Sequence, residues 1–305
     1  MIELVKNPKY DFMAIRNYAF VLSAVLVILG IIGTVQIFRG KANLGIDLAG
    51  GTSIQGKFQK PFTLDEIRSL LTKAGHGEAT LQKVEGENIL LIKLRSETGR
   101  EERMVAEPVL KLLRDKLPGN PFTVESVSEI GPASGHKLRL DATLALAISA
   151  LAIILYLAWR FEFKFGVTAA VATFHDVFAM VGIFWILGIE QDLLFITALL
   201  TIGGYSLTDT VVIFDRIREN IRLRKRSTFS ETINLSVNDV LSRSLVTGFT
   251  LILAVLALLF FGGDVLHNFA LALVIGLVIG SYSSVFVAGP MLVLWRGEKM
   301  ADVKR

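Results

Sequence analysis

Six long apolar stretches, separated by segments rich in charge, are the dominant pattern of this sequence. They cover residues 18–38, 142–159, 167–187, 193–214, 245–261 and 266–294. A helix needs about 17–25 mostly apolar residues to cross a bilayer, and each stretch meets that length. The pattern therefore predicts a polytopic α-helical membrane protein with six transmembrane helices. The first stretch is longer than the apolar core of a signal peptide, so we expect it to be retained as an anchor.

The segment between the first two stretches, residues 39–141, has the mixed pattern of a water-exposed domain. It predicts strands at 52–58, 79–84, 89–94 and 122–130, and helices at 64–74 and 101–117. The order β-α-β-β-α-β is that of an α+β ferredoxin-like domain. Gly131 and Pro132 close the segment, where they form either an ordinary turn or a hinge to the second span.

The distribution of Lys and Arg predicts the orientation of the chain. Basic residues gather in segments 1–17, 160–166, 215–227 and 295–305, whereas 188–192 and 262–268 contain none. Basic loops stay in the cytoplasm. We therefore expect cytoplasmic N- and C-termini, a periplasmic ferredoxin-like domain, and a chain embedded in the inner membrane.

Residues 215–244 are predicted to combine a basic cytoplasmic loop with an amphipathic helix. Thr228 and Glu231 have the spacing of a capping box, and apolar residues then recur every three or four positions as far as Leu241. Such a helix either lies along the cytoplasmic interface of the membrane or packs against the spans.

The remaining composition narrows the classes of function. The 305 residues are 52% hydrophobic and include no cysteine, so no disulfide holds the periplasmic domain. The sequence lacks the phosphate-loop, Gly-x-Ser-x-Gly and His-Glu-x-x-His motifs, and we expect no enzymatic activity, no cofactor and no bound metal. A net charge of +4 reflects membrane topology, and no nucleic-acid partner is expected.

Polar side chains inside the predicted spans are the candidates for chemistry. A charged side chain at the bilayer centre costs about 2.5–3.5 kcal/mol, so it usually faces the bundle interior and has a partner. Tyr205 and Ser206 share one predicted helical face with Asp209 in the fourth span. The third span contains a His-Asp pair and the fifth opens with an arginine: His175, Asp176 and Arg243.

Consecutive spans are antiparallel, so the side chains of Asp209 and Arg243 are predicted to lie at similar depth and close enough to meet. Burial disfavours the charged form of a carboxylate, whereas a nearby guanidinium favours it. A carboxylate poised between these effects is a candidate proton carrier. The alternatives are a static ion pair, an Arg243 that reaches the interface, and a His175–Asp176 pair that only holds helices together.

Small residues recur every fourth position in the sixth span: Ala272, Gly276, Gly280, Ser284 and Ala288. This spacing lets helices approach closely and indicates a packing face rather than a reactive site. We interpret this face as requiring a neighbouring helix, and a partner chain would supply one.

Several motifs resemble the SecF family of membrane subunits, which work with SecD beside the bacterial Sec translocon. They are LGIDLAGGTSIQ after the first span, IGPASG before the second, FHDV in the third, GYSLTDTVVIFDRIREN in the fourth and LSRSLVTG in the fifth. The resemblance covers nearly the whole chain. A SecD-like chain would be expected to read closer to AVDANVLIFERIREE in the fourth span.

The resemblance implies membership of the resistance-nodulation-division superfamily, whose transporters have twelve spans in two similar halves. It implies that SecD supplies the other half, with the SecYEG translocon and translocating precursor polypeptides as further partners. It also implies that Asp209 and Arg243 occupy the proton-pathway positions of the family. The expected function is proton-driven export of secreted proteins across the inner membrane.

Three other functions remain as alternatives. The chain could be half of a resistance-nodulation-division small-molecule exporter, although a far-side domain of this size is small for that role. It could be an intramembrane aspartyl protease that uses Asp176 and Asp209. It could also be a passive scaffold, for which loss of the Asp209 charge would have no effect.

Overall fold

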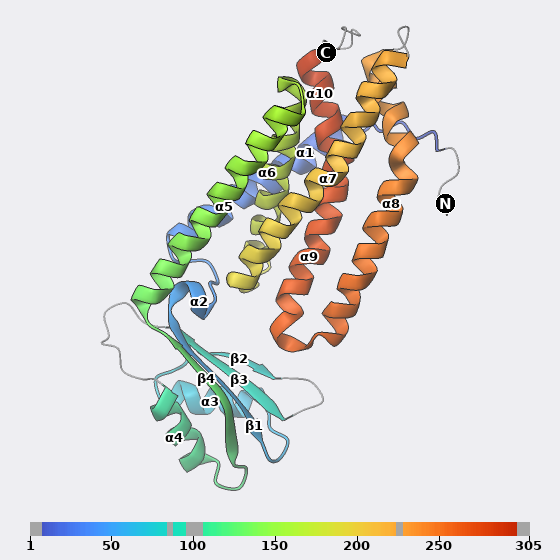
Figure 1. Ribbon diagram of the computed structural model, residues 1–305. Coiled ribbons are helices and arrows are strands. Elements are labelled where there is room, and N and C mark those ends of the chain that lie inside the picture. Colours follow the sequence, from blue (N-terminus) through green and yellow to red (C-terminus); the bar gives the residue numbers. More distant parts are fainter. Residues whose placement is uncertain (1–7, 84–87, 96–105, 224–227, 298–305) are drawn as a thin grey trace. The chain divides into compact units, whose positions relative to one another are not determined.

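A computed structural model describes residues 8–83, 88–95, 106–223 and 228–297 (Figure 1). The chain divides into two compact units. A membrane unit comprises the residues before 44 and after 145, and a small unit comprises residues 44–145.

The small unit contains a four-stranded antiparallel sheet with two longer helices. Its elements are α2 (Ile46–Ala49), β1 (Gly51–Phe58), α3 (Leu64–Lys73), β2 (Thr80–Lys83), β3 (Ile89–Arg95), α4 (Ala106–Lys116) and β4 (Phe122–Ile130). The strand order β2-β3-β1-β4 places β3 between β1 and β2, and β1 between β3 and β4. Each parallel strand pair is therefore split by an antiparallel strand, and the predicted ferredoxin-like fold is confirmed.

The core of the small unit lies between the sheet and the two longer helices. Ile54 of β1 and Ile92 of β3 are fully buried there, and they belong to one cluster with Ile67 of α3 and Val109 of α4. Strand β4 is mostly exposed. The short helix α2 was not predicted. The predicted end of the second strand, residue 84, and the predicted start of the second helix, residue 101, lie outside the described residues.

Glycines close the small unit where it joins α5 (Pro132–Arg160). Gly50 has φ +81°, a conformation that favours glycine, and a Cβ at Gly135 would lie 2.6 Å from the Gly50 backbone nitrogen. Pro132 begins α5, where a missing N–H is tolerated. Helix α5 thus starts ten residues before the predicted span, so any hinge must lie at or before Gly131.

The membrane unit confirms the six predicted spans. They are α1 (Arg16–Phe38), α5, α6 (Phe163–Ile186), α7 (Leu193–Leu223), α8 (Phe229–Phe261) and a last span of three pieces, namely α9 (Gly263–Ser283), a π-helical turn η1 (Ser284–Ala288) and α10 (Gly289–Arg296). Helix α6 and the last span are mostly buried, whereas α1, α5 and α8 expose most of their apolar residues. The exposed faces are suited to contact with lipid or with another membrane chain.

The predicted amphipathic helix is the first part of α8 and is continuous with the fifth span. Thr228 and Glu231 form both hydrogen bonds of the capping box. No Gly or Pro separates this segment from the span, so the helix continues without a break to Phe261. Phe229 and Ile233 are buried in the core of the membrane unit. The alternative of packing against the spans is therefore the correct one.

Two asparagines of α8 hold the segment that precedes α1. The Asn238 side chain accepts a hydrogen bond from the backbone N–H of Tyr10 (3.0 Å) and donates one to its carbonyl (2.9 Å). Asn234, one turn earlier, accepts a hydrogen bond from the Met13 N–H (3.1 Å). The segment before α1 is thus held by α8, and α1 itself packs along α6.

Helices α1 and α6 cross where two glycines allow their backbones to touch. A Cβ at Gly182 would lie 2.6 Å from the backbone nitrogen of Gly30, and a Cβ at Gly30 would lie 2.1 Å from the Phe178 carbonyl oxygen. Side chains larger than hydrogen would therefore force the helices apart.

We predict that Gly182→Ala destabilises the membrane unit by about 1–3 kcal/mol, because overpacking at a rigid backbone contact has that cost. Gly204→Ala in α7 is a matched control, since nothing lies within 4 Å of its added Cβ. Thermal unfolding of the detergent-purified protein measures both. Equal stability of the two variants would contradict the α1–α6 contact.

Candidate functional site

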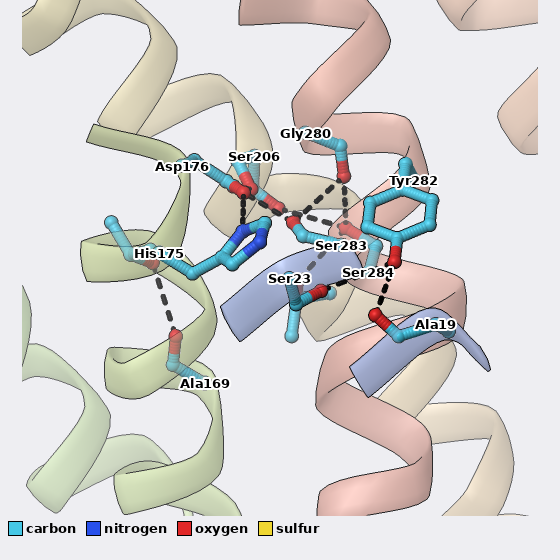
Figure 2. A network of polar contacts seen from close by, with 12 residues as sticks. Ala19, Ser23, Ala169, His175, Asp176, Ser206, Gly280, Tyr282, Ser283 and Ser284 are labelled. Carbon is cyan, nitrogen blue, oxygen red and sulfur yellow. Dashed lines mark hydrogen bonds and ion pairs between the residues drawn. The ribbon is translucent and has the colours of Figure 1, made fainter. Parts of the chain in front are cut away.

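Asp176 of α6 is a fully buried carboxylate within a network of polar side chains (Figure 2). One of its oxygens, Oδ2, accepts hydrogen bonds from Ser206 of α7 and from Ser283 of α9, the latter at 2.8 Å. The other, Oδ1, lies 2.9 Å from Nδ1 of His175. Asp176 therefore joins α6 to α7 and α9 through Oδ2, whereas Oδ1 contacts a neighbour within α6.

His175 continues this network toward α1. Its Nε2 atom is buried and has no hydrogen-bond partner among the described residues, and its ring lies 6.2 Å from the ring of Tyr282. The Tyr282 hydroxyl donates to the carbonyl of Ala19 (2.8 Å) and lies 3.1 Å from the Ser23 hydroxyl (Figure 2). Polar side chains thus extend from Asp176 to the outer helix α1.

The π-helical turn η1 begins beside this network. Ser284, its first residue, donates to the Gly280 carbonyl at 2.9 Å, and its hydroxyl lies 3.0 Å from that of Thr210 in α7. π-Helical turns inside longer helices are frequent at functional sites. Here the turn places two consecutive serines, Ser283 and Ser284, against polar groups of α6 and α7.

Asp209 forms a second and separate polar contact. Its Oδ1 atom accepts a hydrogen bond from the hydroxyl of Ser244 in α8, and the residue is only partly buried. Tyr205, one turn earlier, also faces α8, where its hydroxyl lies near Thr247 and Gly248. The prediction that Ser206 shares a face with Asp209 is wrong, because Ser206 turns toward Asp176 and away from α8.

Arg243 is exposed on the outer surface of α8. Among the described residues no carboxylate lies within ion-pair distance of its guanidinium, so the expected meeting with Asp209 does not occur in this structure. The reason is geometric: Ser244 is rotated about 100° from Arg243 on the helix and takes the position that faces Asp209. The Arg243 side chain is left on the neighbouring, outward-facing part of α8.

Two of the hydroxyl groups that donate directly to the carboxylates, those of Ser244 and Ser283, were not predicted. Both are serines beside a predicted candidate, Arg243 and Ser284 respectively. The sequence signal that could have found them is a hydroxyl within an otherwise apolar span, since a buried hydroxyl needs a hydrogen-bond partner.

The small-residue face of the last span packs against helices of the same chain. A Cβ at Gly276 would lie 2.5 Å from Ile202 of α7 and 2.8 Å from Met180 of α6, and one at Gly280 would lie 3.1 Å from Ser206. The interpretation that this face requires a partner chain is therefore wrong. Its small residues instead bring the Ser283 hydroxyl to Asp176.

The geometry of the two carboxylates does not match that of an aspartyl protease. Asp176 and Asp209 have different hydrogen-bond partners on different helices, so they do not form the shared carboxylate pair that an aspartyl protease requires. The described residues contain no group of three or more acidic or histidine side chains arranged to hold a metal ion.

Comparison with known proteins identifies close relatives. Residues 112–298 match the family model described as "Protein export membrane protein SecD/SecF, C-terminal". The protein translocase subunit SecF of Thermodesulfovibrio yellowstonii is 46% identical over 296 residues, which cover 96% of this chain and 97% of that protein. The SecF subunit of Pseudomonas aeruginosa is 35% identical, with 95% and 92% covered.

A solved structure has the same arrangement. The crystal structure of SecDF, a translocon-associated membrane protein from Thermus thermophilus, matches with a TM-score of 0.80 and 34% identity. The match covers 96% of this chain but 39% of the SecDF chain. This chain therefore spans well under half the length of that relative.

We predict that Ser206→Ala lowers the free energy of unfolding by about 1–3 kcal/mol, because it removes a hydrogen-bond donor from the buried Asp176. Thr208→Ala is the matched control, since its hydroxyl is exposed and bonds only to the Gly204 carbonyl of its own helix. Denaturant unfolding of the purified chain compares the two. A Ser206→Ala variant as stable as Thr208→Ala would contradict a structural role for the network.

Proposed function

This chain belongs to the SecD/SecF family of protein-export membrane proteins, and we propose that it is the SecF-type half of a proton-driven translocation complex. In this proposal a SecD chain supplies the other six spans and the SecYEG translocon supplies the channel. The precursor polypeptide is moved outward, and the chain itself is not an enzyme. The length relation to SecDF supports the proposal, because this chain matches only part of a longer protein of the same family.

The observation that carries the proposal is the exposed polar surface formed by α7 and α8. Arg243 lies on this surface and Asp209 lies at its edge. At a rise of 1.5 Å per residue, Asp209 lies roughly 24 Å along α7 from its first residue, Leu193. Arg243 lies roughly 27 Å along α8 from its last residue, Phe261. Both lie within the depth of a bilayer whose apolar core is about 30 Å thick.

Contact with lipid alone would leave this surface poorly solvated. The exposed threonines of the two helices are tolerable there, since Thr201, Thr208, Thr247 and Thr250 each donate to a carbonyl of their own helix. An exposed guanidinium just inside the apolar core still carries a cost unless it reaches the interface, although that cost is smaller than the roughly 2.5–3.5 kcal/mol of the bilayer centre. A second membrane chain that covers the surface and offers polar groups to Arg243 removes this cost.

Proton coupling follows from the position of Asp209. The carboxylate is partly buried, holds one hydroxyl donor and lies at the edge of the surface that the partner would cover. A small shift of the partner changes its solvation and hence the stability of its charged form. Each proton that crosses the membrane releases about 2.3 kcal/mol per 100 mV, so repeated cycles can bias the motion of a polypeptide.

The other predicted residues have supporting roles in this scheme. Tyr205 lies beside Asp209 on the same contact, and Arg243 supplies positive charge one residue from Ser244. His175, Asp176 and Ser206 form the buried network that fixes the helix carrying Asp209. In this scheme the small unit between α1 and α5 lies in the periplasm, where it contacts the precursor and turns at Gly131, just before Pro132 begins α5.

We predict that Asp209→Asn assembles normally but abolishes the gradient-dependent part of secretion, because the amide keeps the shape and cannot take up a proton. The measurement is secretion of a reporter with and without an uncoupler at matched protein levels. Thr143→Ala, on an exposed position of α5 away from this surface, is the control and should behave as wild type, because its hydroxyl donates to the Arg139 carbonyl of its own helix.

An Asp209→Asn variant that stays as uncoupler-sensitive as wild type would exclude Asp209 as the coupling site. Loss of the complex itself, seen as failure to co-purify with SecD, would instead identify Asp209 as a structural residue.

The orientation gives a separate prediction. A single cysteine at Lys73, in α3 of the small unit, should react with a membrane-impermeant thiol reagent in intact cells. One at Lys164, exposed at the start of α6, should react only after the membrane is opened. The reverse pattern would overturn the periplasmic placement of the small unit.

A further inference from the structure

A basic pocket lies at the end of the membrane unit, apart from both carboxylates of the bundle. It has a volume of about 360 Å³ and is lined by the C-terminal residue of α5 and the last turns of α7: Arg160, Asp215, Arg218, Glu219, Arg222 and Leu223. Three arginines face two acidic residues there. The proposed proton coupling uses none of them.

The carboxylates do not neutralise these arginines fully. Asp215 is shared, at 2.6 Å from Nη2 of Arg160 and 3.8 Å from Nη1 of Arg218. Glu219 pairs at 2.8 Å with Arg216, which does not line the pocket. Arg222 has no carboxylate within ion-pair distance among the described residues. The pocket therefore carries excess positive charge.

Two of the guanidinium groups converge on one aromatic ring. The Cζ atoms of Arg160 and Arg218 lie 4.8 Å and 5.8 Å from the centre of the Phe161 ring. The Nε atom of Arg218 is buried and has no hydrogen-bond partner among the described residues. Like charges held this close favour a bound anion, which the terminal N–H groups of the guanidiniums can hold.

The residues around the pocket are of the kind that contact lipid. Trp159, beside Arg160, is 83% exposed, and Leu223 in the pocket wall is 69% exposed. Exposed tryptophan is typical of the membrane–water interface. The outer face of α5 leading away from the pocket is apolar, with Leu151 and Leu155 exposed. An acyl chain can lie along that face while its headgroup occupies the pocket.

We propose that this pocket binds the phosphate group of an anionic phospholipid. The guanidinium groups would hold the phosphate oxygens, and α5 would carry the acyl chains. Basic pockets at the ends of membrane helices are a general means of recognising anionic lipid headgroups. A bound lipid would fix α5 to the end of α7, the helix that carries Asp209.

The test is titration of the delipidated full-length protein with phosphatidylglycerol or phosphatidylcholine, with bound lipid counted by native mass spectrometry. Wild type should prefer phosphatidylglycerol, and Arg222→Gln or Arg218→Gln should each weaken that binding about fivefold, the loss expected for one basic contact. Lys164→Gln removes an exposed charge at the same end of the membrane unit, outside the pocket, and should bind as wild type.

A soluble competitor distinguishes the lipid from a free anion. Inorganic phosphate at the same concentration should not displace phosphatidylglycerol, because it lacks acyl chains to bind α5. Displacement would overturn the lipid proposal in favour of a free-anion site. Equal losses in Lys164→Gln and Arg222→Gln would overturn it as well, by showing nonspecific charge attraction. Thermal unfolding of Arg222→Gln, expected to match that of wild type, checks that the fold is retained. The test measures lipid binding directly and does not depend on secretion.

Discussion

The packing of the membrane unit depends on the hydrogen bonds of one buried carboxylate. An unpaired polar group inside an apolar bundle is costly, so Asp176 can be buried only because hydroxyl groups reach it from two other helices. Ser206 comes from α7 and Ser283 from α9. The close approach that brings these serines to Asp176 requires the small side chains at Gly276 and Gly280. Helices α6, α7 and α9 therefore form the fixed part of the unit.

The second carboxylate, Asp209, has the opposite setting. It lies on α7 between this fixed part and the exposed surface, and it holds one hydroxyl of α8, an outer helix. The fixed helices hold Asp209 in place, while its surroundings on the exposed surface can change. This combination suits a group that gains and loses a proton during movement. In the proposed complex, the exposed Arg243 on the same surface faces another membrane chain rather than lipid. In this proposal the chain is one half of a working unit.

Much of the fold could be predicted from the sequence, because its signals are local. Apolar stretches gave the six spans, and strand and helix patterns gave the β-α-β-β-α-β order of the small unit. The capping residues Thr228 and Glu231 located the start of α8. The continuation of that helix into the span was missed, since an amphipathic pattern does not say what covers its apolar face. Here segments far apart in the sequence do so, including Phe12.

The site could be predicted in part. A carboxylate within an apolar stretch is unusual enough to identify Asp176 and Asp209 without a structure. Their partners could not be identified, because a hydroxyl contact depends on helix rotation, and a rotation of 100° separates Ser244 from Arg243.

The most direct test of the account is photo-crosslinking from the outer face of α8. A photoreactive residue at Thr247 should form adducts with a second membrane chain, whereas one at Phe249, on the opposite side of the helix, should react only with lipid. Lipid adducts alone from both positions would contradict the central claim that another chain covers the surface beside Asp209.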